Sequence, residues 1–127
     1  MKTEDEQNSK MLKFERNMTL NRYQELAQRT AKRFEDPKMD LVHAAMGASS
    51  DAGELLSEVK AHFIYGKALD VDHLIEEIGD TLWFLQLACA SQNLTLGYVA
   101  SKNLEKLAVR YPEKYTDEHA IQRLDKQ

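Results

Sequence analysis

The sequence predicts an all-α protein, an antiparallel four-helix bundle that assembles as a dimer or tetramer. Helix-breaking residues are scarce, with five Gly and two Pro in 127 residues, and this scarcity favours long helices over many short strands. Apolar residues recur at spacings of three and four along several segments, as they do on one face of a helix. They make up 43% of the chain, and charged residues make up 30%, a balance that can supply the core of one domain.

The first two expected helices have recognisable ends. The first covers residues 20–34, and Thr19 can cap its first turn because a threonine hydroxyl accepts a backbone N–H there. The second covers residues 41–65, with Asp40 as its expected N-cap. Gly66 suits the end of this helix because glycine readily adopts the left-handed conformation that closes many helices.

Two further long helices complete the expected bundle. The third covers residues 73–92, with Asp72 as cap and Asn93 as stop, and the fourth runs from a Thr95 cap to about Arg110. The closing stretch TDEHAIQRLDKQ has room for a short fifth helix. Because the connections are short, we expect neighbouring helices to pack antiparallel.

The third helix is the reason to expect assembly. Beyond Asp80 it is apolar on nearly all sides, and a helix of that kind must be buried. Four helices alone do not cover it completely, so we expect a homodimer or homotetramer.

Charge and composition exclude several classes of partner. The net charge is −4 and Lys and Arg form no basic run, so binding to a nucleic-acid polymer is not expected. No apolar run reaches the roughly 18 residues that cross a bilayer, so no membrane location is expected. The single cysteine, Cys89, forms no internal disulfide, which favours a reducing cytoplasm. Residues 1–18 are expected to form a flexible leader before one domain at residues 19–127.

Five carboxylates lie at helical spacing beside apolar stripes. Asp51, Glu54 and Glu58 fall at i, i+3 and i+7 of the second helix, and Glu77 and Asp80 fall at i and i+3 of the third. Antiparallel packing would let the two groups converge. Buried unpaired carboxylates cost on the order of several kcal/mol each, and a divalent cation offsets that cost best. Ligand sets made only of oxygen suit Mg²⁺ or Mn²⁺.

From spacing alone, these charges have a second interpretation. Acids near a helix start can complement the helix dipole or remain solvated, as expected for Glu76 on another side of the third helix. The same choice applies on the fourth helix, where Asn103, Lys106 and Arg110 share one face and Tyr111 comes next. That face meets either an anion or solvent.

Three stretches resemble the MazG-type, all-α nucleotide pyrophosphohydrolases. The signature of that family is E-x-x-E, a spacer, then E-x-x-D, and it is matched here by Asp51-x-x-Glu54 in DAGELLSEVK and Glu77-x-x-Asp80 in EEIGDTLWFLQLA. NLEKLAVRYPEKY is a third match, and the resemblance covers about residues 23–123. The first position departs from the signature, because Asp51 is one methylene shorter than Glu. It can still ligate Mg²⁺, through water or by passing part of its role to Glu58.

The resemblance implies a reaction. Such enzymes cleave a nucleoside triphosphate between the α and β phosphates, giving the monophosphate and pyrophosphate, often to cleanse the nucleotide pool. It implies that Mg²⁺, or Mn²⁺, is held by the four signature acids, and that Glu54 or Glu58 orients or deprotonates the attacking water. The residues implied for phosphate contact are Asn103, Lys106, Arg110 and Tyr111.

Recognition of the base is harder to place. Phe84 lies on the same side of the third helix as the acids, where it either stacks on a base or packs in the core. His43, on the same side of the second helix as Glu54, is one candidate for an edge contact. The remaining histidines, including His73, are expected to be solvated or to cap helices and are assigned no role.

Two rival functions can be compared with the sequence. A ferritin-type di-metal bundle needs Glu-x-x-His pairs on two helices, and the sequence contains none. A helical regulatory or dimerisation module that binds nucleotide or metal without catalysis stays open, since binding and hydrolysis use the same residues. Turnover of triphosphates separates such a module from an enzyme.

Overall fold

The computed structural model describes residue 3 and residues 17–127, and every regular element in that part of the chain is a helix. The prediction of an all-α fold is therefore confirmed. The expected leader, residues 1–18, lies almost wholly outside the described residues. The elements are α2 (Leu20–Ala27), the 3₁₀ turn η1 (Gln28–Thr30), α3 (Pro37–Phe63), α4 (Val71–Ser91), α5 (Leu96–Arg110), α6 (Asp117–Gln122) and the 3₁₀ turn η2 (Leu124–Lys126).

Two of the four expected N-caps are confirmed. The Thr19 hydroxyl accepts the backbone N–H of Arg22, and the Thr95 hydroxyl accepts that of Tyr98, each at 3.1 Å. At the far ends, the expected stops Gly66 and Asn93 lie just after α3 and α4 and adopt positive φ angles of 69° and 55°.

The other two caps lie earlier in the chain than predicted. Asp36 caps α3 in place of Asp40, because Pro37 has no N–H to satisfy and its fixed φ suits the first helical position. Asp40 is instead buried in the first turn, where it accepts the backbone N–H of Phe34. Asp70 caps α4 in place of Asp72. The first expected helix is also shorter, and it tightens into η1 at Gln28.

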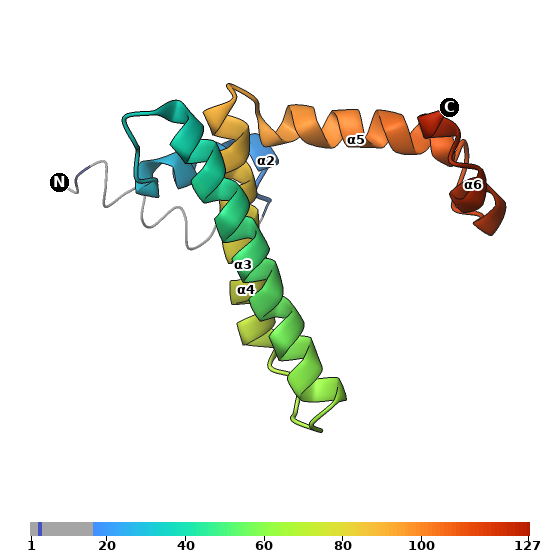
Figure 1. Cartoon of the computed structure of the whole chain (residues 1–127), viewed down its shortest axis with the longest axis horizontal. Helices are drawn as coiled ribbons and strands as arrows, with labels where there is room; N and C mark the ends of the chain where they lie inside the picture. Colours follow the sequence, from blue (N-terminus) through green and yellow to red (C-terminus); the bar gives the residue numbers. More distant parts are fainter. Residues whose placement is uncertain (1–2, 4–16) are drawn as a thin grey trace.

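One chain does not complete the four-helix bundle that the sequence predicted. Figure 1 shows α3 and α4 as a long antiparallel pair, with α2 beside its upper end and α5 leaving it at a steep angle toward α6. Hydrogen bonds between α2 and the start of α5 fix this direction. The Gln24 amide donates to the Leu94 carbonyl at 2.9 Å and accepts the Leu96 N–H at 2.6 Å, while Asn21 accepts the Gly97 N–H at 2.9 Å.

The core lies where α2, α3 and α4 meet. Leu87 and Gln86 are fully buried on α4, and the side-chain oxygen of Gln86 accepts a hydrogen bond from the Gln28 side chain. Also on α4, the Phe84 ring packs against α3 at Gly47, where a Cβ would come within 2.3 Å of the ring.

Much of the remaining apolar surface is exposed within one chain. The part of α4 beyond Asp80 is not covered on all sides by one chain, because Leu85 is 46% exposed. Nearer the start of α4, Ile75 and Ile78 are 62% and 54% exposed. Other large exposed apolar residues on α3 and α5 are Leu56, Phe63, Tyr98, Leu104 and Val109. No helix in the described ranges is long and apolar enough to cross a membrane.

The contact between Gly47 and Phe84 yields a test of the α3–α4 packing. Gly47→Ala should destabilise the protein by about 1–3 kcal/mol, because the added methyl forces the Phe84 ring out of its position. Gly53→Ala, on the same helix with nothing within 4 Å of the new methyl, should instead stabilise by up to about 1 kcal/mol through helix propensity. Urea unfolding of both variants measures the difference, and equal effects would contradict this packing.

Candidate functional site

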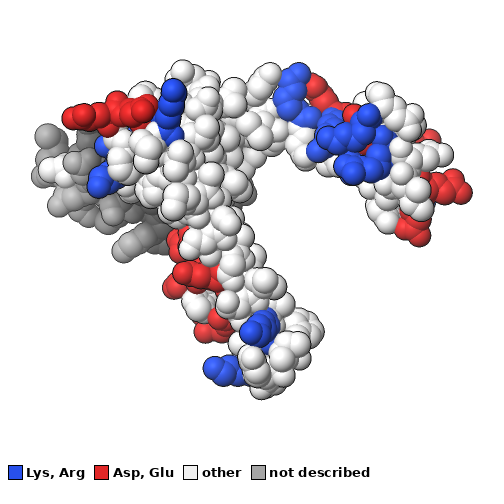
Figure 2. Space-filling model, viewed as in Figure 1, with Lys and Arg blue, Asp and Glu red and all other residues white. Residues whose placement is uncertain are grey.

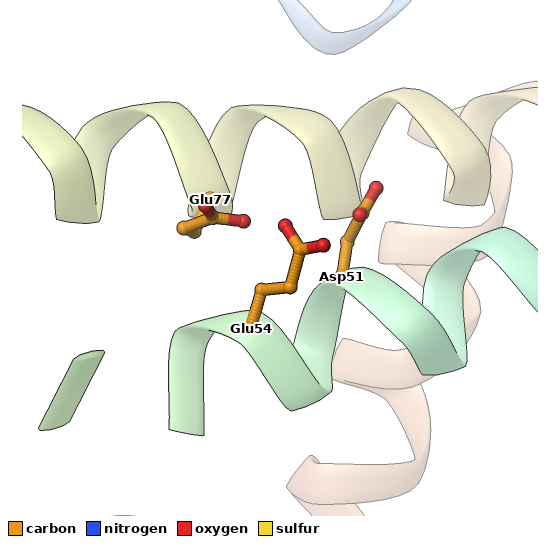
Figure 3. Close-up of side chains that lie close together, drawn as sticks. All are labelled: Asp51, Glu54 and Glu77. Carbon is orange, nitrogen blue, oxygen red and sulfur yellow. The ribbon is translucent and has the colours of Figure 1, made fainter. Parts of the chain in front are cut away.

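Three of the predicted carboxylates converge between α3 and α4. Asp51 and Glu54 project from successive turns of α3, and Glu77 projects toward them from α4 (Figure 3). One oxygen from each lies within 4.8 Å of the others. The i, i+3 spacing on α3 puts both acids on the side that faces α4, so the antiparallel pairing alone brings the three together.

The two other acids lie around this group. Asp80, one turn beyond Glu77, is outside the group of three, but its charge helps to raise the pKa values of Asp51 and Glu77. Glu58 is half-buried on α3, one turn beyond Glu54. Glu76 is exposed, as the sequence predicted.

The carboxylates repel one another, and this repulsion raises pKa values in the group. Burial raises the pKa of Glu77, which is only 6% exposed, and so do a hydrogen bond with Glu54 and the Glu54 charge. Burial also raises the pKa of Asp51, with Glu54 and Asp80 adding to the effect. Oε2 of Glu77 is buried and has no hydrogen-bond partner among the described residues. A proton or a cation in this space would relieve the repulsion.

A divalent cation fits these residues. The donors are all carboxylate oxygens, which Mg²⁺ and Mn²⁺ prefer, and they come from two helices that already hold them close together. The buried, undonated oxygen of Glu77 is an acceptor that a cation would satisfy.

His73 joins this site, although sequence reasoning gave it no role. Its Nδ1 lies 2.8 Å from Oε2 of Glu58, and its Nε2 lies 3.1 Å from Oε1 of Glu77. The hydrogen bond with Glu58 raises the pKa of His73. The i, i+4 spacing of His73 and Glu77 was a usable signal. It was missed because the histidines other than His43 were expected to be solvated or to cap helices.

The predicted phosphate-binding residues are not brought to the acids within one chain. Asn103 and Lys106 are exposed on α5. Figure 2 shows Asp and Glu side chains along the α3–α4 arm and a separate group of Lys and Arg side chains on the α5 arm. Arg110 forms a two-pronged ion pair with Asp125, at 2.6 and 2.8 Å, and Tyr111 lies beside Arg110.

Phe84 and His43 lie in the contact between α3 and α4. The Phe84 ring is edge-on to His43 at 5.4 Å and to Trp83 at 5.0 Å. Nδ1 of His43 is buried and has no hydrogen-bond partner among the described residues. Phe84 is thus a packing residue in this structure, one turn from Asp80.

The raised pKa values predict how the metal-free protein responds to pH. Because folded Glu77 holds its proton above the ordinary carboxyl value of 4.5, the folded state binds more protons than the unfolded chain. Stability should therefore fall as pH rises from 4.5 through the raised value. Glu54→Gln should make this decline shallower, because Glu54 helps to raise the pKa values of both Glu77 and Asp51.

Thermal unfolding in chelator measures this decline. The unfolding temperatures should be compared between pH 4.5 and about 6, below the ordinary pKa of His73. At higher pH the raised pKa of His73 also makes stability fall as pH rises. Glu76→Gln, an exposed control on α4, should leave the decline as in wild type. Identical pH profiles for all three proteins would contradict the electrostatic account.

Comparison with known proteins agrees with this arrangement. The family model of the MazG nucleotide pyrophosphohydrolase domain matches residues 45–115, more than half of the chain. The matched range contains the converging acids, His73, the whole of α5 and the residues after it up to Tyr115. Searches of curated proteins and of solved structures each gave no match. The chain belongs to the MazG nucleotide pyrophosphohydrolase family.

Proposed function

We propose that this protein is a divalent-metal-dependent nucleoside triphosphate pyrophosphohydrolase. The reaction adds water across the α–β phosphoanhydride and releases a nucleoside monophosphate and pyrophosphate. The convergence of Asp51, Glu54 and Glu77 carries the proposal, because it supplies a cation site made of oxygen in a chain of this family. Cleansing of the nucleotide pool is the role that this chemistry would serve.

Four acids would hold the cation, Mg²⁺ or Mn²⁺. Asp51, Glu54 and Glu77 would contribute directly, and Asp80 lies near enough to act on the charges of the first and last. Once bound, the cation would supply positive charge to the phosphate oxygens of the substrate. Its loss would leave the acids to repel one another.

A carboxylate on α3 would prepare the water. Glu54 or Glu58 would accept a hydrogen bond from the attacking water and take its proton as the phosphorus–oxygen bond forms. The α–β bridging oxygen leaves with pyrophosphate. Phe84, packed one turn from Asp80, would form the wall of the site nearest the base, with His43 behind it.

The phosphate-binding side of the site would come from a second copy of the chain. Asn103 and Lys106 lie on an arm that diverges from the acids, yet the charges of the two arms are complementary (Figure 2). Both arms also expose apolar residues, such as Ile78 and Leu104, at 54% and 65%. A homodimer or homotetramer that packs α5 of one copy against α3 and α4 of another would cover those residues and complete the site. Arg110 and Tyr111 could join the phosphate contacts where Asp125 releases Arg110.

The first test separates the acids by role. Glu54→Gln should lower turnover at saturating Mg²⁺ by about 100-fold or more, the scale expected of a positioned catalytic group. Glu76→Gln should leave turnover near wild type, because its side chain is exposed. Pyrophosphate release from a panel of nucleoside triphosphates measures both variants and also identifies the preferred base.

Excess chelator is the control, and it should abolish wild-type turnover. Wild-type rates in Glu54→Gln, or full activity in chelator, would contradict the metal-dependent mechanism. No pyrophosphate release by the wild type from any triphosphate would favour the alternative of a nucleotide-binding regulatory module.

The second test asks whether two copies share a site. Glu54→Gln and Lys106→Ala should each have low hydrolytic activity when tested alone. For Lys106→Ala the loss should appear as a raised KM. In a mixed dimer, one site combines intact acids from one copy with the intact lysine of the other. Mixing equal amounts should therefore restore about a quarter of wild-type activity at subsaturating substrate, since half of the dimers are mixed and half of their sites are intact. No recovery after subunit exchange would place Lys106 in the same copy as its acids.

A further inference from the structure

His73 occupies a defined place between the two helices that carry the acids. It lies in the first turn of α4, where Oδ1 of Asp70 accepts its backbone N–H at 3.1 Å. From there its ring reaches Glu58 on α3 through Nδ1, at 2.8 Å, and Glu77 on its own helix through Nε2, at 3.1 Å. One side chain therefore links an acid of α3 to an acid of α4.

We propose that His73 is a positioning residue, which holds Glu58 and Glu77 so that the remaining oxygen of each faces the cation and the attacking water. This inference rests on the function proposed above. Each carboxylate has two oxygens, and the ring contacts Oε2 of Glu58 and Oε1 of Glu77. Oε1 of Glu58 and the buried Oε2 of Glu77 are left for the site.

The geometry favours a supporting role over direct ligation. Both ring nitrogens are engaged by carboxylates, so neither has a free lone pair directed at a cation. Partners of this kind around metal ligands fix the ligand's orientation, and their loss commonly weakens metal affinity or activity by about 10–100-fold. A long, flexible Glu side chain gains most from such support because it has several rotatable bonds to fix.

A purely structural role is less consistent with the surroundings of His73. Its side chain is 44% exposed, so its removal opens no cavity in the core. The α3–α4 contact depends instead on packing such as that of Phe84 on Gly47. Loss of the His73 ring should therefore change the site more than the fold.

The test compares His73→Ala and His73→Gln with wild type. Direct titration with Mn²⁺, followed by electron paramagnetic resonance without substrate, should show binding weakened by about 10-fold or more in His73→Ala. Turnover should fall through kcat, with the KM for the triphosphate nearly unchanged. His73→Gln should recover part of both losses, because its amide can still donate to Glu58. The unfolding midpoint in chelator should fall only slightly, because the side chain that bridges Glu58 and Glu77 is 44% exposed.

A double-mutant cycle shows whether His73 acts through Glu58. His73→Ala should cost less Mn²⁺ affinity and kcat in a Glu58→Gln background than in wild type, since one of the two carboxylates it orients is already changed. In a Glu76→Gln background it should cost as much as in wild type. Equal costs in both backgrounds, or Mn²⁺ binding unchanged in His73→Ala, would overturn the inference.

These outcomes distinguish the two proposals. If wild type binds Mn²⁺ but hydrolyses no triphosphate, the proposed function fails, and the Mn²⁺ titrations still decide the role of His73. If wild type hydrolyses triphosphate and His73→Ala binds Mn²⁺ equally well, the positioning role alone fails.

Discussion

Repulsion between carboxylates held across the α3–α4 contact is the constraint on which the rest of this structure depends. The two helices must pack closely for the chain to have a core, and Phe84 against Gly47 sets how closely they approach. The same approach forces Glu77 toward Asp51 and Glu54, at a distance where their charges cannot all persist unaided. Packing on one stretch of the helices therefore determines the electrostatics of the next.

The chain relieves only part of that repulsion with its own residues. His73 contacts one oxygen each of Glu58 and Glu77, and a shared proton between Glu54 and Glu77 relieves more when pH allows. The predicted phosphate-binding cations Lys106 and Arg110 lie on α5, and Arg110 is already paired with Asp125. Such a separation leaves the acidic site open to a cation from outside.

Helical periodicity made the local part of this arrangement predictable. Spacings of three and four placed Asp51 with Glu54, and they also placed Glu76 on the exposed side of α4. What periodicity could not supply was the direction of α5. That direction depends on hydrogen bonds of Gln24 and Asn21 with residues 70, 72 and 76 positions further along the chain. No local sequence pattern encodes contacts at such separations. His73 was missed for a related reason, since its partner Glu58 belongs to the preceding helix.

The hydrogen bonds of Gln24 separate two properties of the molecule. A single amide holds both the carbonyl of Leu94 and the N–H of Leu96, so it sets the angle between the arm that carries the acids and the arm that carries the cations. A substitution there would redirect one arm and leave every carboxylate in place. The direction of α5 and the placement of the carboxylates are therefore determined by different residues, so a change at Gln24 can alter the first without touching the second.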